Sequence, residues 1–390
     1  MSRPARSARS RLSWQEPGVR AVVFQCLLLA AVAGVAWFLV SNTLANLASR
    51  NITTGFGFLH QEAGFAIGES LIPYTSADTY GRAIIVGLIN TLHVSIVCIV
   101  AATVFGTLLG VARLSRNWLI SRLAGGYVEI MRNIPLLLHL FFWYAIITEN
   151  LPGPRQALHP LAGVFLSNRG LKLPGLQGGA LDWTVGGFAL AVVLALLLAH
   201  WARAHRRARG WFSAGRLACV LLVALPLAGW VLGGASVTLD LPHLRGFNFQ
   251  GGITITPEFA ALSIGLVVYT TAFVAEVVRS GIQSVGRGQW EAAQALGLSR
   301  SRTLRLVILP QALRVVVPPM TSQFLNVTKN SSLAIAVGYP DIVSVVNTTL
   351  NQTGQALEGI LIIMAAYLAV SLLIALFMNW YNRRLALMER

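Results

Sequence analysis

Long apolar segments separated by short polar stretches dominate this chain. A helix that crosses a bilayer needs roughly 20 mainly apolar residues, and eight segments approach or exceed that length. They are 21–40, 83–111, 134–148 together with the helix before it, 183–201, 214–234, 257–278, 314–346 and 357–381. The pattern predicts an all-α fold, a polytopic membrane bundle of about eight transmembrane helices.

The segment 314–346 is less regular than the others. It contains Pro318 and Pro319, which we expect to interrupt the helix, and a polar run at 328–332. Broken backbone at membrane depth is tolerated only where it faces protein or a water-filled cavity. We therefore expect this segment to line a translocation path, with a kinked helix that has a polar outer end as the alternative.

The loops suggest how the chain is organised. Stretches 149–182 and 235–256 are rich in glycine, with proline or threonine, and we expect irregular loops there. Phe56, Leu59 and Phe65 give 41–82 one apolar face, which would lie either on the membrane surface or in a packed loop. We divide the chain into a basic tail (1–20), an anchor with an outside segment (21–82), the first part of a core (83–148), an insertion with an extra helical hairpin (149–256) and the second part of the core (257–390).

Charge supports a membrane topology. Charged residues make up 11% of the chain, against about 25% in soluble domains. With an inside amino terminus and eight crossings, 23 of the 30 Lys and Arg residues fall on the inside and 7 on the outside, as the positive-inside rule requires. Both termini are therefore predicted to be cytoplasmic. The net charge of +16 reflects topology and contact with anionic lipid rather than nucleic acid.

Tests for chemistry are negative. A phosphate-binding P-loop needs Gly-Lys followed by Ser or Thr, but the two lysines, Lys172 and Lys329, follow Leu171 and Thr328. No HExxH or GxSxG motif occurs, so the sequence does not favour an enzyme. No CxxC pair or metal-ligand spacing occurs either. The three cysteines, Cys26, Cys98 and Cys219, lie in apolar segments. We expect each to be buried and to act as a small hydrophobic side chain.

Ionisable residues within spans are candidates for function. Glu276 and Arg279 are three residues apart at the inner end of the sixth span, so they form either a helix-end ion pair, which we favour, or part of a path. His93 and Glu129 have the same two interpretations, path wall or packing. A Gly106-x-x-x-Gly110 pattern indicates close helix packing.

The loop 280–310 is the most distinctive polar segment. Glu291-Ala292-Ala293 opens a good helix-forming run, and Gly297 can take the left-handed conformation that ends a helix. A second helix is expected at 299–307, closed by Pro310. Two short helices at an angle would form a knob that fits a cleft in a partner, with an ordinary amphipathic loop as the alternative.

This loop resembles a known motif. The pattern Glu-Ala-Ala, three residues, Gly, nine residues, Ile-x-Leu-Pro marks the inner-membrane permeases of binding-protein-dependent ABC importers, and only Val307 departs from it. Other stretches resemble polar and general L-amino-acid permeases and their glutamate/glutamine/aspartate relatives over nearly the whole chain. These stretches are 63–65, 90–92, 112–115, 127–129, 132–137, 276–279, 288–289 and 329–333.

The resemblance implies a five-helix, MetI-like core to which the first span and the hairpin are extra. It also implies a bacterial inner-membrane importer in which two permeases, this one and a paralogue, form the path. Two cytoplasmic ATPase subunits use the ATP, so no cofactor binds this chain directly, and a soluble periplasmic protein delivers the amino acid. ATPase-coupling residues would be Glu291, Ala292, Ala293, Gly297, Leu309 and Pro310. Candidate path residues are Glu129, Arg132, Pro135, Glu276, Arg279, Lys329, Asn330, Ser331 and Ser332.

Two other classes remain open at this point. An ion-coupled secondary transporter would need charged residues at mid-span, whereas the ionisable residues here lie near span ends. A channel subunit or scaffold would have no ATPase partner. The sequence does not identify which amino acid is carried.

Overall fold

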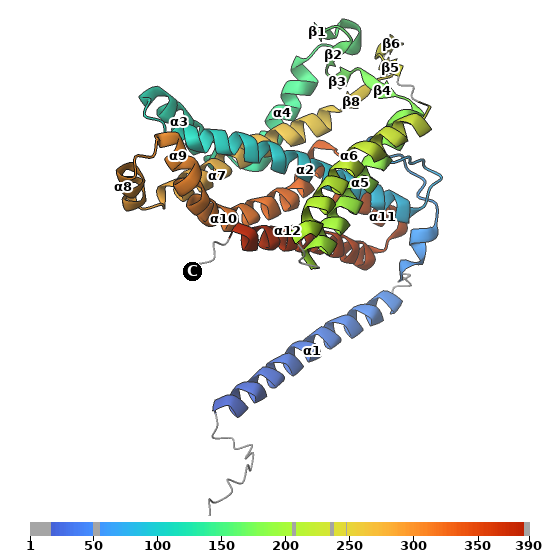
Figure 1. Ribbon diagram of the computed structural model, residues 1–390. Helices are drawn as coiled ribbons and strands as arrows, with labels where there is room; N and C mark the ends of the chain where they lie inside the picture. Colours follow the sequence, from blue (N-terminus) through green and yellow to red (C-terminus); the bar gives the residue numbers. More distant parts are fainter. Residues whose placement is uncertain (1–16, 50–54, 205–207, 235–237, 247, 386–390) are drawn as a thin grey trace, which may run out of the picture.

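The chain is a bundle of long helices with short strands at one end (Figure 1). The computed structural model describes residues 17–49, 55–204, 208–234, 238–246 and 248–385, so most of the basic tail lies outside it. Among the described residues, six helices are long and apolar enough to cross a membrane, or seven if one bent pair is a single span. A shorter apolar helix, Trp183–Leu198, accounts for the remaining expected segment. The predicted all-α membrane bundle is confirmed.

The bundle is built from two halves of the chain that the hairpin separates. Its helices are α2 (Tyr80–Arg113), α3 (Trp118–Asn133), α4 (Leu136–Asn150), α7 (Pro257–Gln283), α10 (Leu309–Asn330), α11 (Ile342–Thr353) and α12 (Ala356–Leu385). The bent pair is α3 and α4, which meet at an angle of 102°.

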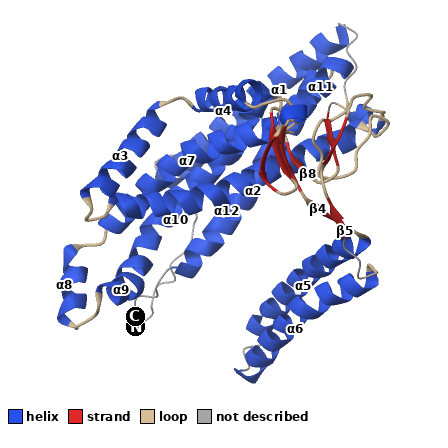
Figure 2. Ribbon diagram, turned by 90° about the horizontal axis from the view of Figure 1, so that it is seen from above, coloured by secondary structure: helices blue, strands red, loops and turns tan. Residues whose placement is uncertain are grey.

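The bundle has two distinct ends (Figures 1 and 2). The first, which we call the loop end, carries α8 (Arg287–Ala295), α9 (Arg300–Thr303) and a π-helical turn, η3 (Leu304–Ile308). The opposite end, the strand end, carries the strands and a 3₁₀ turn, η2 (Pro154–Gln156). The strands are β1 (Leu158–Leu161), β2 (Val164–Ser167), β3 (Gly170–Leu173), β4 (Gly175–Gln177), β5 (Thr238–Asp240), β6 (His243–Arg245), β7 (Asn248–Gln250) and β8 (Ile253–Ile255).

These strands replace the irregular loops expected at 149–182 and 235–256. An antiparallel sheet has the order β1-β2-β3-β8, and two further pairs join β4 to β5 and β6 to β7. Lys172 of β3 lies opposite Thr254 of β8, so residues on either side of the hairpin are paired. The prediction of irregular loops was wrong because strands of three or four residues are too short to show an alternating pattern.

The hairpin itself consists of α5 (Gly179–Ala204) and α6 (Ala208–Leu232). Its helices approach so closely that a Cβ added to Gly229 would lie 2.2 Å from the carbonyl oxygen of Trp183. This is the close backbone approach that small residues permit between membrane helices. Most large apolar side chains of the hairpin are exposed, as expected of a lipid-facing pair.

Helix α1 (Pro17–Ser49) runs away from the bundle (Figure 1). Its apolar side chains are exposed, Trp37 by 77%. The helix continues to Ser49, so residues 41–49 do not belong to a loop as expected. Apolar Leu44, Ala45 and Leu47 extend the helix-forming composition beyond the hydrophobic segment proper.

The segment after α1 packs against the bundle. It contains a 3₁₀ turn, η1 (Phe56–His60), and Phe58 and Ala63 are buried with Tyr80 of α2 and Ile342 of α11. Of the two interpretations of this segment, the packed loop is the one that the structure shows.

Small residues also bring α2 and α7 together. A Cβ on Gly106 would lie 2.5 Å from Val274 Cβ, and one on Gly110 would lie 2.7 Å from the carbonyl oxygen of Ala275. The close helix packing predicted from Gly106 and Gly110 is confirmed. The largest buried cluster joins other parts of these two helices to α4 and to the segment after η4, and it includes Val94, Leu140, Leu262, Leu266 and Tyr339.

Helix α10 passes through Pro318 and Pro319 without ending. The expectation that these prolines interrupt the span was wrong. Each proline removes one backbone hydrogen bond, but Val316, Val317 and Met320 pack in a buried cluster with other helices, and this packing holds the helix together. The backbone changes instead in the polar run, where a 3₁₀ segment, η4 (Ser331–Val337), follows Asn330.

Of the three cysteines that were expected to be buried, only one is buried. Cys98 is buried, but Cys26 and Cys219 are exposed. The last two lie on faces of α1 and α6 that other parts of the described chain do not cover, so an apolar segment there does not imply a buried side chain.

Candidate functional site

Helix α8 ends in a well-defined hydrogen-bonded cap. Gly297 has φ = +69°, its N–H donates to the Gln294 carbonyl (2.9 Å), and the N–H of Leu298 donates to that of Ala293 (3.1 Å). This pair of bonds is the Schellman motif, which satisfies carbonyls at a helix end and favours glycine. The predicted left-handed glycine is confirmed, and it turns the chain sharply toward α9.

One face of α8 is anchored and the other is open. Trp290 packs in a cluster with Val285, Ile308 and Ala312, and Ala293 is buried. The side chain of Gln311 on α10 donates to that of Gln289 (3.1 Å). The open face presents Glu291, Ala292 and Leu296, the last of them 79% exposed. The result is a firmly held knob with a small apolar surface and one carboxylate.

The second half of the loop differs from the prediction. Helix α9 covers only Arg300–Thr303, and the π-helical turn joins it to α10, with the Leu309 N–H donating to the Leu304 carbonyl. Pro310 lies in the first turn of α10, so it does not close the helix as expected. A proline has no N–H to donate to the carbonyl four residues earlier, and its ring crowds that carbonyl. The π turn just before Pro310 forms hydrogen bonds between residues five apart, so the backbone there is wider and leaves room for the ring.

Three charged side chains join α2 to α7 at the loop end. Glu276 accepts hydrogen bonds from Arg113 through Oε2 and from Arg279 through Oε1, and Arg279 Nε lies 3.1 Å from Oε2. The predicted ion pair between Glu276 and Arg279 is confirmed. Arg113 was missed because its contact comes from helix packing between distant parts of the sequence.

The nine candidate path residues do not gather in one cluster. Arg132 on α3 places its guanidinium 5.1 Å from the centre of the Phe273 ring, and Glu129 on the same helix is exposed. Pro135 precedes α4 at the bend. Among the residues at the end of α10, Lys329 is exposed and Asn330 half-buried.

The two serines that follow are bonded to nearby carbonyls. Ser331 donates to the Thr328 carbonyl and Ser332 to that of Lys329 (both 2.7 Å). Ser331 is buried, so its hydroxyl supports the turn from α10 into η4. For His93 the structure shows packing, because its ring stacks on Phe259 with centroids 4.9 Å apart.

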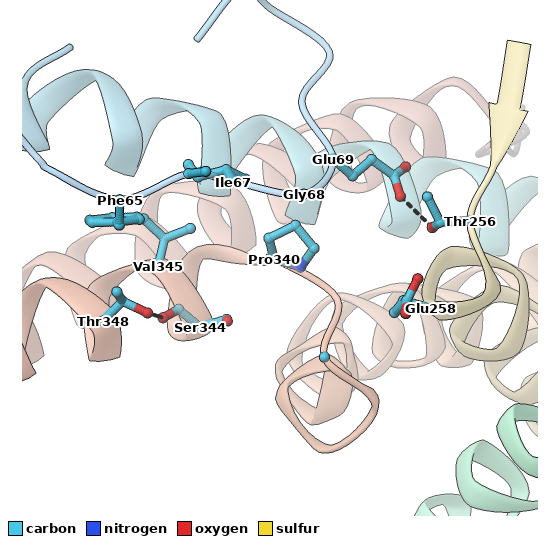
Figure 3. A pocket seen from close by; sticks show the side chains of 12 residues that line it. Phe65, Ile67, Gly68, Glu69, Thr256, Glu258, Pro340, Ser344, Val345 and Thr348 are labelled. Atoms are coloured by element: carbon cyan, nitrogen blue, oxygen red, sulfur yellow. Dashed lines mark hydrogen bonds between the residues drawn. The ribbon is translucent and has the colours of Figure 1, made fainter. Parts of the chain in front are cut away.

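A cavity of about 360 Å³ opens at the strand end (Figure 3). The Thr256 hydroxyl donates to Glu69 Oε2 (2.6 Å) and accepts from the Phe259 N–H (3.1 Å), so one threonine both caps α7 and fixes the carboxylate. Glu258 lines the same cavity. Burial raises the pKa of Glu69, with the Thr256 hydrogen bond acting in the opposite direction and the charge of Glu258 adding to the rise.

A fully buried carboxyl lies beside this cavity, at the start of α11. Asp341 Oδ1 accepts from the Ser344 N–H (2.9 Å), and the Tyr367 hydroxyl of α12 donates to Oδ2 (3.5 Å). The Ile342 N–H donates to Thr91 Oγ1 of α2 (3.0 Å). Burial raises the pKa of Asp341 to about 7, against the lowering effect of its hydrogen bonds.

These strand-end residues were not predicted from the sequence, although one signal was available. Thr256-Pro257-Glu258 combines an N-cap residue, proline at the first helical position and an acidic first turn, which together mark a helix start. Nothing in the pattern places Glu69 or Asp341 beside it. Among the described residues no group of three or more His, Cys, Asp or Glu side chains could hold a metal ion.

Comparison with known proteins identifies the class. Residues 102–387 match the family model of the binding-protein-dependent transport system inner membrane component. The chain belongs to this family, and it is a transport permease subunit.

Individual relatives cover the chain almost completely. It is 51% identical to the putative amino-acid ABC transporter permease protein YhdX of Escherichia coli K12, over 100% of both chains. It is 46% identical to the general L-amino acid transport system permease protein AapQ of Rhizobium johnstonii, over 97% of this chain and 96% of that one. It is 42% identical, over 95% of each, to the glutamate/glutamine/aspartate/asparagine transport system permease protein BztB of Rhodobacter capsulatus.

Proposed function

We propose that this permease is the transmembrane subunit of an ATP-driven, binding-protein-dependent importer of L-amino acids. The observation that carries the proposal is the anchored knob of α8, whose open face and Gly297 cap lie at the loop end of a bundle that belongs to the permease family. The names of three relatives that each cover at least 95% of the chain support amino acids as the cargo. Two of those names specify general L-amino acids or the acidic amino acids and their amides, so a broad range is the working substrate class.

In this proposal the chain does no chemistry itself. A dimer of cytoplasmic ATPase subunits binds ATP and grips the face formed by Glu291, Ala292 and Leu296, and a sister permease, a paralogue, completes the path. A periplasmic binding protein delivers the amino acid at the strand end. ATP acts by shifting a two-state equilibrium of the bundle, because the ATPase binds one arrangement of the knobs more tightly than the other.

The same proposal fixes the topology. The loop end faces the cytoplasm of a bacterium, both termini lie on that side, and the protein resides in the inner membrane. The bias of arginine toward the loop-end segments supports this orientation. Of the candidate path residues, Glu276 and Arg279, which form an ion pair, would then lie near the cytoplasm, and Lys329 would lie nearer the outside.

Gly297→Asp tests the coupling role against a matched control. No atom lies within 4 Å of the position of a Cβ on Gly297, and aspartate adopts the left-handed conformation at modest cost. Gly246 at the strand end has the same conformation (φ = +67°) and equally open surroundings, so Gly246→Asp repeats the change at the opposite end.

We expect Gly297→Asp to reach the membrane in normal amount, to lose most of the copurifying ATPase and to abolish uptake. Gly246→Asp should retain the ATPase. Equal ATPase recovery and normal uptake by both variants would contradict docking at this loop. Amino acid accumulation that follows an ion gradient when the ATPase cannot hydrolyse ATP would support a secondary transporter instead. Competition among the twenty amino acids for uptake would then define the substrate range.

A further inference from the structure

A second, larger cavity lies at the loop end. Its volume is about 1110 Å³, and it is bounded by the end of α2, the start of α3, α8, α9 and the π-helical turn. It lies at the level where α2 and α7 end. This is the border between membrane and water if these helices cross the bilayer. The cavity faces the side of the loop that holds Trp290, whereas Glu291 and Ala292 are not part of its lining.

The rim of this cavity is strongly basic. Four arginines line it and no acidic side chain does. All four are exposed, and none forms an ion pair with another described residue within 4.0 Å. Guanidinium groups bind phosphate oxygens in a bidentate manner, so four arginines that line one cavity with no carboxylate among them favour an anionic group with several oxygens. The four are Arg116, Arg287, Arg300 and Arg305.

The inner wall is apolar. Leu108 and Val111 of α2, Ile120 of α3 and Leu304 of the π-helical turn face it, and their exposed fractions range from 39% for Leu304 to 64% for Leu108. A free phosphate would satisfy the arginines but leave this wall in water. The two chemistries together fit one occupant with an anionic head and a hydrocarbon tail.

We propose that an anionic phospholipid, its phosphate held by Arg116, Arg300 and Arg305, occupies this cavity. Basic pockets between membrane helices bind the headgroups of such lipids. Arg116 lies in the turn between α2 and α3, whereas Arg300 and Arg305 belong to the loop. The bound phosphate therefore bridges the turn between α2 and α3 to α9 and the π-helical turn, and it favours one position of this part of the loop relative to α2.

Lipid binding to the full-length chain, purified in detergent, tests this directly. Native mass spectrometry would count bound phosphatidylglycerol, with phosphatidylcholine of the same acyl chains and inorganic phosphate as comparison probes. The cavity variant combines Arg116→Gln, Arg300→Gln and Arg305→Gln. The matched control combines Arg122→Gln, Arg302→Gln and Arg383→Gln, three exposed arginines that do not line the cavity.

We expect one tightly retained phosphatidylglycerol on the unmodified chain and on the control. The cavity variant should bind it at least about tenfold more weakly. Phosphatidylcholine should be retained weakly by all three, and inorganic phosphate should not displace the lipid. If the triple cavity variant does not fold, Arg116→Gln alone, in an exposed turn, should still lower retention relative to Arg122→Gln.

Three results would overturn the proposal. An equal loss in the cavity and control variants would mean diffuse attraction to the basic surface. Displacement by inorganic phosphate would mean a site for a free anion. Loss of the lipid from the assembled complex with its ATPase would mean that a protein surface covers the cavity. None of these readings depends on transport, so the test is independent of the proposed cargo.

Discussion

The guanidinium of Arg113, in the last turn of α2, and the carboxylate of Glu276, on α7, form an ion pair at the loop end, and Arg279 holds the second oxygen of the same carboxylate. One anion thus serves two cations where two packed helices approach their ends. The side chains of Arg113 and Glu276 are only 17% and 28% exposed, so the pair is partly shielded from water.

Removing this carboxylate should destabilise the bundle. Glu276→Gln leaves Arg113 and Arg279 facing each other without a counter-charge. We expect a cost of about 1–2 kcal/mol, between the values for exposed and fully buried pairs, read as a lower melting temperature in detergent. Arg113→Met should cost less, since Arg279 still pairs with Glu276. Glu129→Gln, an exposed carboxylate on α3, is the control, and an equal effect there would argue against the ion pair.

Close contact between α2 and α7 predicts that alanine substitution at Gly110 lowers stability much more than alanine substitution at Gly125. Gly110→Ala places a methyl group 2.7 Å from the Ala275 carbonyl oxygen, so the helices must separate, at a cost of about 1–3 kcal/mol. Gly125→Ala, in α3, meets no atom within 4 Å and should be neutral or slightly stabilising, because alanine favours a helix. Thermal unfolding of both variants in the same detergent compares them, and similar melting temperatures would contradict the packing.

The cap after α8 predicts which residues can replace Gly297. Asparagine visits the left-handed region readily, whereas a β-branched side chain there is strained by roughly 1–2 kcal/mol. Gly297→Asn should therefore keep the loop ordered, and Gly297→Val should loosen it. Trypsin cleavage after Arg300 and Arg302 measures this difference. Equal cleavage rates for the two variants would mean that the turn does not depend on its backbone conformation.

Asp341 predicts a pH dependence of stability. Its pKa is 3.8 in an exposed chain and about 7 in the fold, so between these values the folded state holds a proton that the unfolded state has released. Stability then falls as pH rises from about 4 to about 7. Asp341→Asn retains the N-cap acceptor and has no such titration.

Melting curves of the two proteins across this pH range provide the measurement. They should melt alike near pH 4, and the unmodified chain should fall below the asparagine variant near pH 8. A constant difference at every pH would show that the carboxyl does not titrate in the fold.

The apolar segments predicted the type of the long helices and roughly their number, about eight against six or seven among the described residues, because a helix that faces lipid must be apolar along its length. They did not predict where such a helix ends when the flanking residues are also good helix formers, as at 41–49. The prolines of α10 were misjudged for a related reason. A proline removes one hydrogen bond locally, and whether the helix continues depends on the contacts of Val317 and Met320 with other helices.

The loop was predicted more accurately than the rest of the site. Gly297 determines the helix end through its own backbone freedom, which is a local property. Arg113, Glu69 and Asp341 could not be placed, because their partners lie on other elements far along the chain and depend on how α2, α7 and α11 pack. The coupling and path roles assigned from resemblance stay predictions.

The unbroken course of α10 has a mechanical consequence. With 22 residues, it is a rod of roughly 33 Å that starts directly at the π-helical turn and reaches η4. The hydrogen bonds on either side of Pro318 and Pro319 resist compression, so a movement imposed at the first residue is transmitted toward the far end as tilt or rotation. The 3₁₀ segment has weaker hydrogen-bond geometry and is the natural joint for absorbing that motion.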